Sequence, residues 1–455
     1  MAGATEAQPS TSAPAAAPPP GALKLPQCCG SARVDFNFND PCYVFRAVPN
    51  PASGLVAASV SNHTIKLYQP SGPQLSLVGE LRGHRGTITD ISFCASSNPS
   101  LLLSSSADGT VVAWDTRTGQ PAERYEVRGQ EVFSFSSLGH MLAAGSTGEV
   151  LFWDRRQGGG SKALAKLDDT HMEDVTQVRF HSSGRVLSGS MDGLIAVHDV
   201  SKSFDDDDVF QAAININNSV EEFGMYGGDG GRLWIRTGTE SVHLWEWLRA
   251  TDEGVPGGDM QFADFGEARN TASQACAASA AASLIPQVDY LVGCHYDAPS
   301  SQLFLLAGHN DGPVAFVPVL EQAGPQGNMV AAAMACPGVA LAGGHNSIVR
   351  SVQCVGDGSS GVFAVTGGED ALVCMWTLDP ALAAAGAAAA AAGAGGAAGG
   401  QAAGGGGGAG PARQHGHGQG QPGGGRGGGR QGQGGGRHAK QQQHQGAKNR
   451  RPSPY

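Results

Sequence analysis

Apolar and polar positions alternate over short runs in residues 83–115, which read "GHRGTITDISFCASSNPSLLLSSSADGTVVAWD". Each run spans about six residues, and the runs are separated by Asn, Ser, Pro and by the pair Asp108-Gly109. Period-two alternation bounded by turn residues is typical of half-buried strands that pair with their sequence neighbours. The segment therefore predicts antiparallel β-strands rather than helices.

The same interval of six residues, from a turn residue to the end of an apolar strand, recurs along the chain. It joins the pairs Asn62–Tyr68, Asp108–Trp114, Thr147–Trp153, Asp192–His198, Thr239–Trp245, Asp311–Val317 and Asp370–Trp376. Successive endings lie 46, 39, 45, 47, 72 and 59 residues apart. A Gly-His start, a Trp-Asp end and a spacing of about 40–45 residues resemble the WD repeat, in which each unit is one blade of a propeller.

Seven repeats predict an all-β fold, a seven-bladed WD-repeat β-propeller with extra loop in its last two blades. One four-stranded blade cannot bury both of its faces, whereas blades arranged in a ring cover one another. The ring must also be closed by the chain ends. Residues 32–40, "ARVDFNFND", alternate polar and apolar side chains, and we expect them to complete the last blade.

In WD repeats the Gly-His histidine, a Ser or Thr, the turn aspartate and the strand-end tryptophan form a buried hydrogen-bonded set. Buried polar groups need such partners because an orphaned one costs roughly 1–3 kcal/mol. The resemblance assigns this structural role to three blades, through the residues His84, Ser104, Asp108, Trp114, His171, Ser188, Asp192, His345, Thr366, Asp370 and Trp376. His198 replaces the tryptophan in the fourth blade, so we expect an altered network there.

The stretch "HMEDVTQVRFH" (171–181) raises the alternative of a metal site, because it holds two histidines, a glutamate and an aspartate. Aligned with "HRGTITDISF" (84–93), it places His171 in the column of His84. His181 would lie at the other end of a strand, about 30 Å away at ~3.3 Å per residue. This separation favours a structural His171, and we predict no metal ligands.

The sequence contains no recognisable catalytic or cofactor-binding motif. "GDGSSG" (356–361) fits the spacing of a dinucleotide-binding loop, but it lies between two strand patterns with no helix after it. The run Asp205–Asp208 lacks the order of a calcium loop. We therefore expect no cofactor and no enzymatic activity, although an enzyme that uses the central channel is an alternative.

The residues that follow the Gly-His column are the candidates for partner contacts. They are Arg85, Glu173, Asp174 and Asn346, together with the mid-strand residue Arg350. The insert 246–297 between the fifth and sixth repeats is predicted to be a variable loop with a short helix, or alternatively a docking element.

Composition divides the chain into three parts: an Ala/Pro-rich leader predicted to be disordered (1–30), the propeller (31–380) and a low-complexity tail rich in Ala, Gly, Arg and Gln (381–455). Eight of the 29 Lys and Arg residues and none of the 40 acidic residues lie in the tail. The tail thus carries +8, while residues 1–380 retain 21 basic and 40 acidic residues and a net charge of −19. An acidic body is joined to a basic tail.

The tail suggests a second kind of partner. Glycine alternates with Arg426, Arg430 and Arg437, as in RGG segments that contact RNA through phosphate attraction and guanidinium stacking. The alternative is that the tail is a low-complexity extension that binds no ligand. The nine cysteines form no C-x-x-C pair and the N-terminus lacks a signal peptide, so we expect an intracellular protein, nuclear, nucleolar or cytoplasmic, with no membrane contact.

Five further segments narrow the resemblance within the WD-repeat proteins. They are "THMEDVTQVRFHSSGRVLSGSMDGLIAVHDV", "DYLVGCHYD", "GHNDGPVAF", "GGHNSIVRSVQ" and "TGGEDALVCMW", and together they resemble the WD repeat-containing protein 89 family and its plant Gigantus-type relatives. The resemblance covers roughly residues 40–380. It implies a non-enzymatic scaffold for other proteins, a monomer within complexes, with plant members associated with ribosome biogenesis and growth control. A ribonucleoprotein factor that binds RNA through the tail is the alternative function.

Overall fold

The computed structural model describes residues 23–34, 42–71, 74–94, 98–160, 162–201, 204, 209–251, 260–356 and 362–378. The chain divides into two units, 1–400 and 401–455, and the second contains no described residue. Most of the predicted leader, the run Asp205–Asp208 and the whole predicted tail, with Arg426, Arg430 and Arg437, therefore lie outside the described residues.

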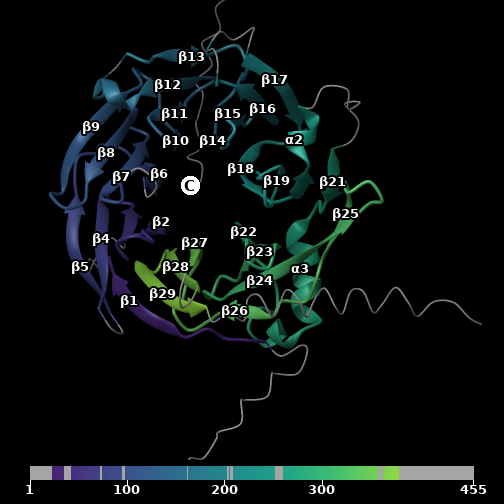
Figure 1. Ribbon diagram of the computed structural model, residues 1–455. Helices are drawn as coiled ribbons and strands as arrows, with labels where there is room; N and C mark the ends of the chain where they lie inside the picture. The colour runs from purple at the N-terminus through teal and green to yellow at the C-terminus, as the bar shows by residue number, and fades with distance from the viewer. Residues whose placement is uncertain are drawn as a thin grey trace, which may run out of the picture. The chain divides into compact units, whose positions relative to one another are not determined.

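The strands form seven antiparallel blades, as the repeat predicts (Figure 1). The first four blades comprise β2 (Val44–Pro49), β3 (Val56–Val60), β4 (Ile65–Ser71) and β5 (Gln74–Leu81); β6 (Ile88–Phe93), β7 (Leu101–Ser106), β8 (Thr110–Asp115) and β9 (Gln120–Glu126); β10 (Ser134–Leu138), β11 (Met141–Gly145), β12 (Val150–Asp154) and β13 (Ala165–Leu167); and β14 (Gln177–Phe180), β15 (Arg185–Gly189), β16 (Leu194–Asp199) and β17 (Phe210–Asn215).

The fifth to seventh blades follow the same order. They comprise β18 (Val220–Tyr226), β19 (Arg232–Thr237), β20 (Val242–Trp245) and β21 (Gln261–Asp264); β22 (Tyr290–Asp297), β23 (Gln302–Gly308), β24 (Val314–Ala323) and β25 (Met329–Met334), with β26 (Val339–Leu341) also paired to β24; and β27 (Val349–Gly356), β28 (Val362–Gly368), β29 (Leu372–Leu378) and β1 (Cys28–Arg33).

The first strands of the blades form the inner wall of a closed ring. Contacts run from β2 to β6, β10, β14, β18, β22 and β27 in turn, and then from β27 back to β2. Apolar side chains between neighbouring blades form the core, with Trp114 and Trp376 each 1% exposed. The predicted all-β, seven-bladed propeller is confirmed.

The closing strand begins earlier than predicted. β1 pairs antiparallel with β29, with Ser31 opposite Cys374 and Arg33 opposite Leu372, so it includes residues 32 and 33 of the predicted strand 32–40. Residues 35–40 of that prediction lie outside the described residues. β1 also lies against β5, where a side chain at Gly30 would contact Leu75 and Met375. The sequence of β1, "CCGSAR", shows little apolar alternation. The ordered body thus begins before residue 31, the predicted boundary of the leader.

The insert 246–297 contributes to the core. It contains the short helix α2 (Trp247–Ala250), strand β21, the helix α3 (Ala268–Ala277), the 3-10 turn η2 (Ala280–Ser283) and strand β22. Ala268, Ala272 and Cys276 repeat at a spacing of four residues and are fully buried, in a helix that packs against β24 and β25. A second 3-10 turn, η1 (Arg155–Gln157), follows β12. No helix in the described part of the chain is long and apolar enough to cross a membrane.

Candidate functional site

The second blade carries a complete chain of hydrogen bonds between its polar repeat residues. Asp108 Oδ2 lies 3.2 Å from His84 Nδ1, and His84 Nε2 lies 2.7 Å from Ser104 Oγ. Trp114 Nε1 donates to the same hydroxyl at 2.8 Å. An ionised carboxylate only accepts, so His84 Nδ1 carries the proton and Nε2 accepts from Ser104. Every polar atom of the set is thereby satisfied in the blade interior.

Asp108 also determines the path of the loop after the histidine. Its Oδ2 accepts a bond from the Arg85 backbone N–H at 2.8 Å, and its Oδ1 accepts two bonds from Thr110. Burial alone would raise the pKa of Asp108, but the bonds from His84, Thr110 and Arg85 outweigh burial and hold the pKa well below its usual range. The ionised aspartate thus fixes the backbone that presents Arg85.

The seventh blade repeats this arrangement with threonine in place of serine. His345 lies 3.0 Å from Asp370 Oδ1 and 2.7 Å from Thr366 Oγ1, and Trp376 Nε1 donates to Thr366 at 2.9 Å. Asp370 Oδ2 accepts from the Asn346 backbone N–H at 3.0 Å. Asn346 therefore occupies the position that Arg85 holds in the second blade.

The fourth blade has the histidine and the aspartate but no tryptophan. His171 lies 3.2 Å from Asp192 Oδ2 and 2.8 Å from Ser188 Oγ, while the Met172 N–H donates to Asp192 at 3.0 Å. Burial lowers the pKa of His171 below its usual value despite the opposing charge of Asp192. The neutral imidazole of His171 therefore connects Ser188 on β15 with Asp192 in the turn that follows this strand.

His198 occupies the tryptophan position without replacing its hydrogen bond. Its Nε2 bonds to Thr170 Oγ1 at 3.1 Å rather than to Ser188, and its buried Nδ1 has no partner in the described residues. Burial lowers the pKa of His198 to about 4. The network of this blade is therefore altered, in the way that the substitution in the sequence led us to expect.

His181 lies at the other end of β14 from His171 and has its own partners. Its Nδ1 lies 2.8 Å from Ser183 Oγ, and its Nε2 lies 2.8 Å from the Asp229 carbonyl oxygen. Both nitrogens of each histidine in "HMEDVTQVRFH" are thus engaged by protein atoms. The described residues contain no group of three metal-ligating side chains.

Four of the candidate partner residues, Arg85, Glu173, Asp174 and Asn346, lie on one face of the propeller. We call this face, which consists of these residues, Met172 and the loops that carry them, the His–Asp face. Arg85, Glu173 and Asn346 are exposed there, and Asp174 is half-buried. Met172, which the sequence analysis missed, is 92% exposed, and the nearby Met191 is 47% exposed. The Met191 N–H donates to the Asp174 carbonyl oxygen, so the two methionine loops are joined. A methionine inside "HMED" could have been found by its position directly after the Gly-His column.

Arg350 has a different environment. It lies on the inner strand β27 and forms an ion pair with Glu369 at 2.5 Å, with its guanidinium 5.9 Å from the centre of the Phe45 ring. Its side chain is only 28% exposed. The structure thus places Arg350 in the wall of the ring, apart from the loops that carry the other four candidates.

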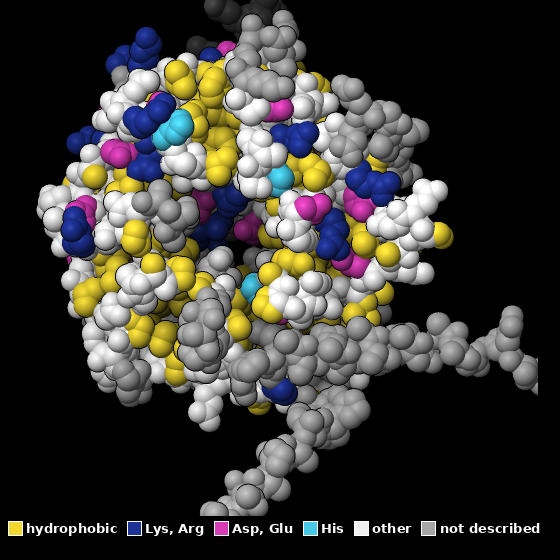
Figure 2. Space-filling model, viewed as in Figure 1, with side chains coloured by type: hydrophobic (Ala, Val, Ile, Leu, Met, Phe, Trp, Pro, Cys, Tyr) yellow, Lys and Arg dark blue, Asp and Glu magenta, His cyan; other side chains and the backbone are white. Residues whose placement is uncertain are grey.

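Charged side chains cross the central channel of the ring, where Figure 2 shows dark blue and magenta atoms in the hollow. Arg46 in blade 1 lies 3.5 Å from Asp90 in blade 2 and 3.7 Å from Glu222 in blade 5. Arg179 in blade 4 pairs with the same Asp90 at 3.4 Å, and Arg236 pairs with Glu222 at 3.5 Å. Blades 1 and 5 are not neighbours, and neither are blades 2 and 4, so the Arg46–Glu222 and Arg179–Asp90 pairs span the channel. These channel residues could have been found in the sequence, because each inner strand that carries one is otherwise largely apolar.

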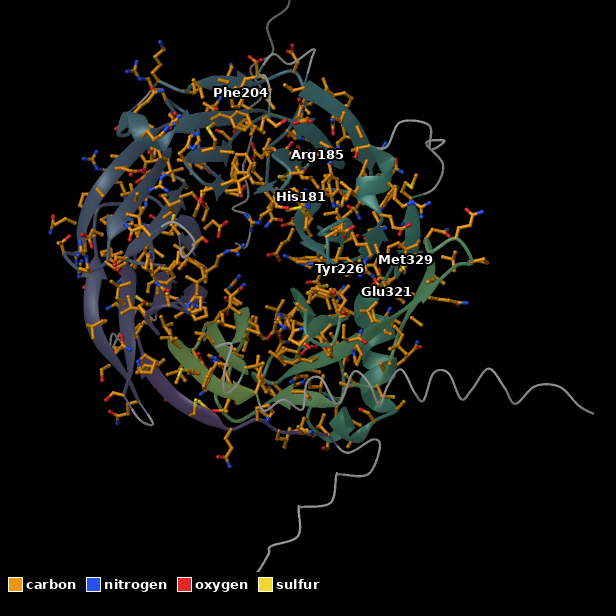
Figure 3. All side chains as sticks on the ribbon, in the orientation of Figure 1. His181, Arg185, Phe204, Tyr226, Glu321 and Met329 are labelled. Carbon is orange, nitrogen blue, oxygen red and sulfur yellow. The ribbon has the colours of Figure 1, made fainter. Side chains whose placement is uncertain are left out.

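A second polar cluster joins blades 5 and 6 at the strand ends opposite the His–Asp face. Tyr226 donates to Glu321 Oε1 at 2.5 Å, and Arg232 forms an ion pair with the same carboxylate and lies over the Tyr226 ring. Figure 3 shows Tyr226 beside Glu321 and Met329. Burial raises the pKa of Glu321, although both partners oppose the shift. These contacts connect neighbouring blades, so a structural role accounts for them.

Comparison with known proteins identifies the family. The family described as WD domain, G-beta repeat matches residues 75–115 and 162–199. The WD repeat-containing protein GTS1 of Arabidopsis thaliana is 36% identical over 358 residues, which cover 76% of this chain and 83% of the relative. The WD repeat-containing protein 89 homolog of Dictyostelium discoideum is 32% identical over 281 residues, 61% of this chain and 71% of the relative.

A more distant match is the guanine nucleotide-binding protein subunit beta of Saccharomyces cerevisiae. It is 24% identical over 174 residues, which cover 35% of this chain and 40% of the relative. WD repeat proteins generally act as protein-interaction scaffolds and are typically non-enzymatic. With its seven blades, its His–Asp networks and these similarities, the chain belongs to the WD repeat proteins, in the family of GTS1 and the WD repeat-containing protein 89 homolog.

Proposed function

We propose that this protein is a non-enzymatic scaffold that binds other proteins through its His–Asp face. The observation that carries the proposal is that the turn aspartate plays the same two roles in three blades. Asp108, Asp192 and Asp370 each hold a buried histidine and also the backbone N–H of the next residue. The side chains presented by these three loops are Arg85, Met172 and Asn346.

Such loops suit recognition because their conformation is already fixed. A partner that binds a preorganised loop does not need to order it, which lowers the entropic cost of association. Methionine provides a flexible and polarizable surface that adapts to different apolar side chains. Met172 at 92% exposure is therefore better accounted for as a contact than as a packing residue.

The test is quantitative affinity purification with the full chain from growing cells. We expect Met172→Asp and Asn346→Lys to lose a reproducible set of proteins at unchanged thermal stability. The matched control is Val330→Asp, which changes a 47% exposed residue on the outermost strand of blade 6. A partner set that is the same for all variants, or no reproducible partner, would contradict the proposal.

The resemblance to the Gigantus-type proteins supports ribosome biogenesis and growth control as the setting that we propose. Ribosomal subunits assemble from many protein partners, which is a task for a scaffold. Depletion of the protein followed by measurement of subunit levels tests this setting: a defect in one subunit is expected, and unchanged subunits would refute it.

RNA binding by the tail is a second candidate, favoured by the excess of basic over acidic residues in 381–455. Contacts to phosphates should weaken steeply with salt. We expect replacement of Arg426, Arg430 and Arg437 by Ala in the full chain to reduce RNA crosslinking. Equal RNA crosslinking of the wild type and the variant would show that these arginines do not bind RNA.

A further inference from the structure

A cavity of about 200 Å³ opens beside Arg85 on the His–Asp face of the second blade. Its wall combines the loop after His84, the turn at Asp108 and the strand end at Glu126. Three arginines line it, Arg85, Arg124 and Arg128, against only two carboxylates, Asp108 and Glu126. Arginines therefore outnumber carboxylates in its lining, whereas the first 380 residues as a whole carry a net charge of −19.

Neither carboxylate forms an ion pair with Arg85. Both oxygens of Asp108 already accept bonds, Oδ2 from His84 and the Arg85 backbone, and Oδ1 from Thr110. Glu126 lies 3.8 Å from Arg124, at the long end of ion-pair distances. The Arg85 guanidinium is exposed and has no ion pair with any described residue.

We infer that this cavity binds the anionic side chain of an acidic peptide segment in a partner protein. A guanidinium presents parallel N–H donors that match a carboxylate or a phosphate group, and its backbone here is held in place by Asp108. The volume accommodates one such side chain rather than a whole cofactor. The inference rests on the proposed scaffold function and specifies one of its contacts.

A peptide selection with the purified full chain tests this assignment. A random 12-residue peptide library is selected on the wild-type protein and, in parallel, on Arg85→Glu, whose exposed position leaves the fold intact. We expect peptides enriched only on the wild type to share an Asp or Glu. Changing that residue to Gln should weaken binding about tenfold or more, the loss of one charge-assisted contact.

Three matched changes sharpen the result. Arg85→Lys should bind the peptide more weakly than the wild type but more tightly than Arg85→Glu. Lysine keeps the positive charge but lacks the parallel N–H donors of the guanidinium. Glu126→Gln should bind severalfold more tightly, since it releases Arg124. A Lys in place of the selected acidic residue should recover binding to Arg85→Glu. A phosphoserine at that position identifies phosphate as the preferred source if it binds more tightly than glutamate, and a carboxylate if it does not.

Equal binding to wild type and Arg85→Glu, selection of basic peptides only, or no enriched peptide would overturn the inference. These outcomes are separable from failure of the scaffold function. If affinity-purified partners are lost with Met172→Asp but retained with Arg85→Glu, the scaffold function stands and the acidic-peptide site falls.

Discussion

At the scale of single residues, the buried histidines decide how the loops of the His–Asp face are held. Each imidazole bonds to an aspartate and to a hydroxyl, so removing it takes one hydrogen bond from each of these groups in the blade interior. The exposed residues beside the histidines contribute little to folding by comparison. The buried histidines thus contribute to stability, whereas the exposed residues next to them are available for recognition.

His171→Ala should lower the free energy of unfolding by about 2–4 kcal/mol, because Asp192 and Ser188 lose their shared partner. Bound metal, measured on the purified protein by elemental analysis, should not change. His140→Ala is the control, since His140 is exposed and the change should cost less than about 0.5 kcal/mol. Loss of metal from His171→Ala would revive the metal hypothesis.

His198 should make stability fall with acid in a defined range. Its pKa is about 4 in the folded chain and about 6.5 in the unfolded chain, so the unfolded state binds more protons between these values. The free energy of unfolding should therefore drop as the pH falls from 6.5 toward 4, and stay constant for this group above 6.5.

Urea unfolding of the wild type and of His198→Phe at pH 7.5 and pH 4.5 isolates this effect. The wild type should lose about 2 kcal/mol more than the variant between the two pH values. Equal losses would show that His198 does not titrate in the predicted range.

At the scale of elements, ring closure depends on β1, which supplies the fourth strand of the last blade. Ser31→Pro should lower the free energy of unfolding by about 2 kcal/mol or more, because proline disrupts a strand held between β29 and β5. Ser31→Thr is the control and should leave stability within about 0.5 kcal/mol. Equal thermal stability of the two variants would mean that β1 does not close the ring.

The sequence repeat predicted the strands that recur in every blade. It did not predict features that occur only once in the chain. The six-residue interval located the third strand of every blade, because each blade must bury the same apolar positions. The start of β1 was not predicted because its sequence, "CCGSAR", shows little apolar alternation. Met172 was not among the candidates, although its position directly after the histidine column was a signal, because periodicity does not reveal how exposed a side chain is.

At the scale of the whole molecule, two of the ion pairs, Arg46–Glu222 and Arg179–Asp90, connect blades that are not neighbours in the ring. Arg46→Met should cost about 3 kcal/mol, because it leaves Asp90 and Glu222 without their shared cation in a partly buried site. Combining it with Glu222→Gln should cost less than the two single changes together. Arg82→Met, which removes a 71% exposed partner of Glu80, should cost less than about 1 kcal/mol. Equal unfolding energies for Arg46→Met and Arg82→Met would contradict a role for the channel network.

Binding of partners to the His–Asp face involves loops from three blades and is therefore a property of the whole molecule. Hydrogen exchange followed by mass spectrometry, on the native complex purified through the full chain and on the protein alone, tests it most directly. We predict slower exchange in the complex for residues 83–87, 169–175 and 343–348, with no change in the outer strand β25. Protection confined to outer strands, or no protection on the His–Asp face, would contradict the account.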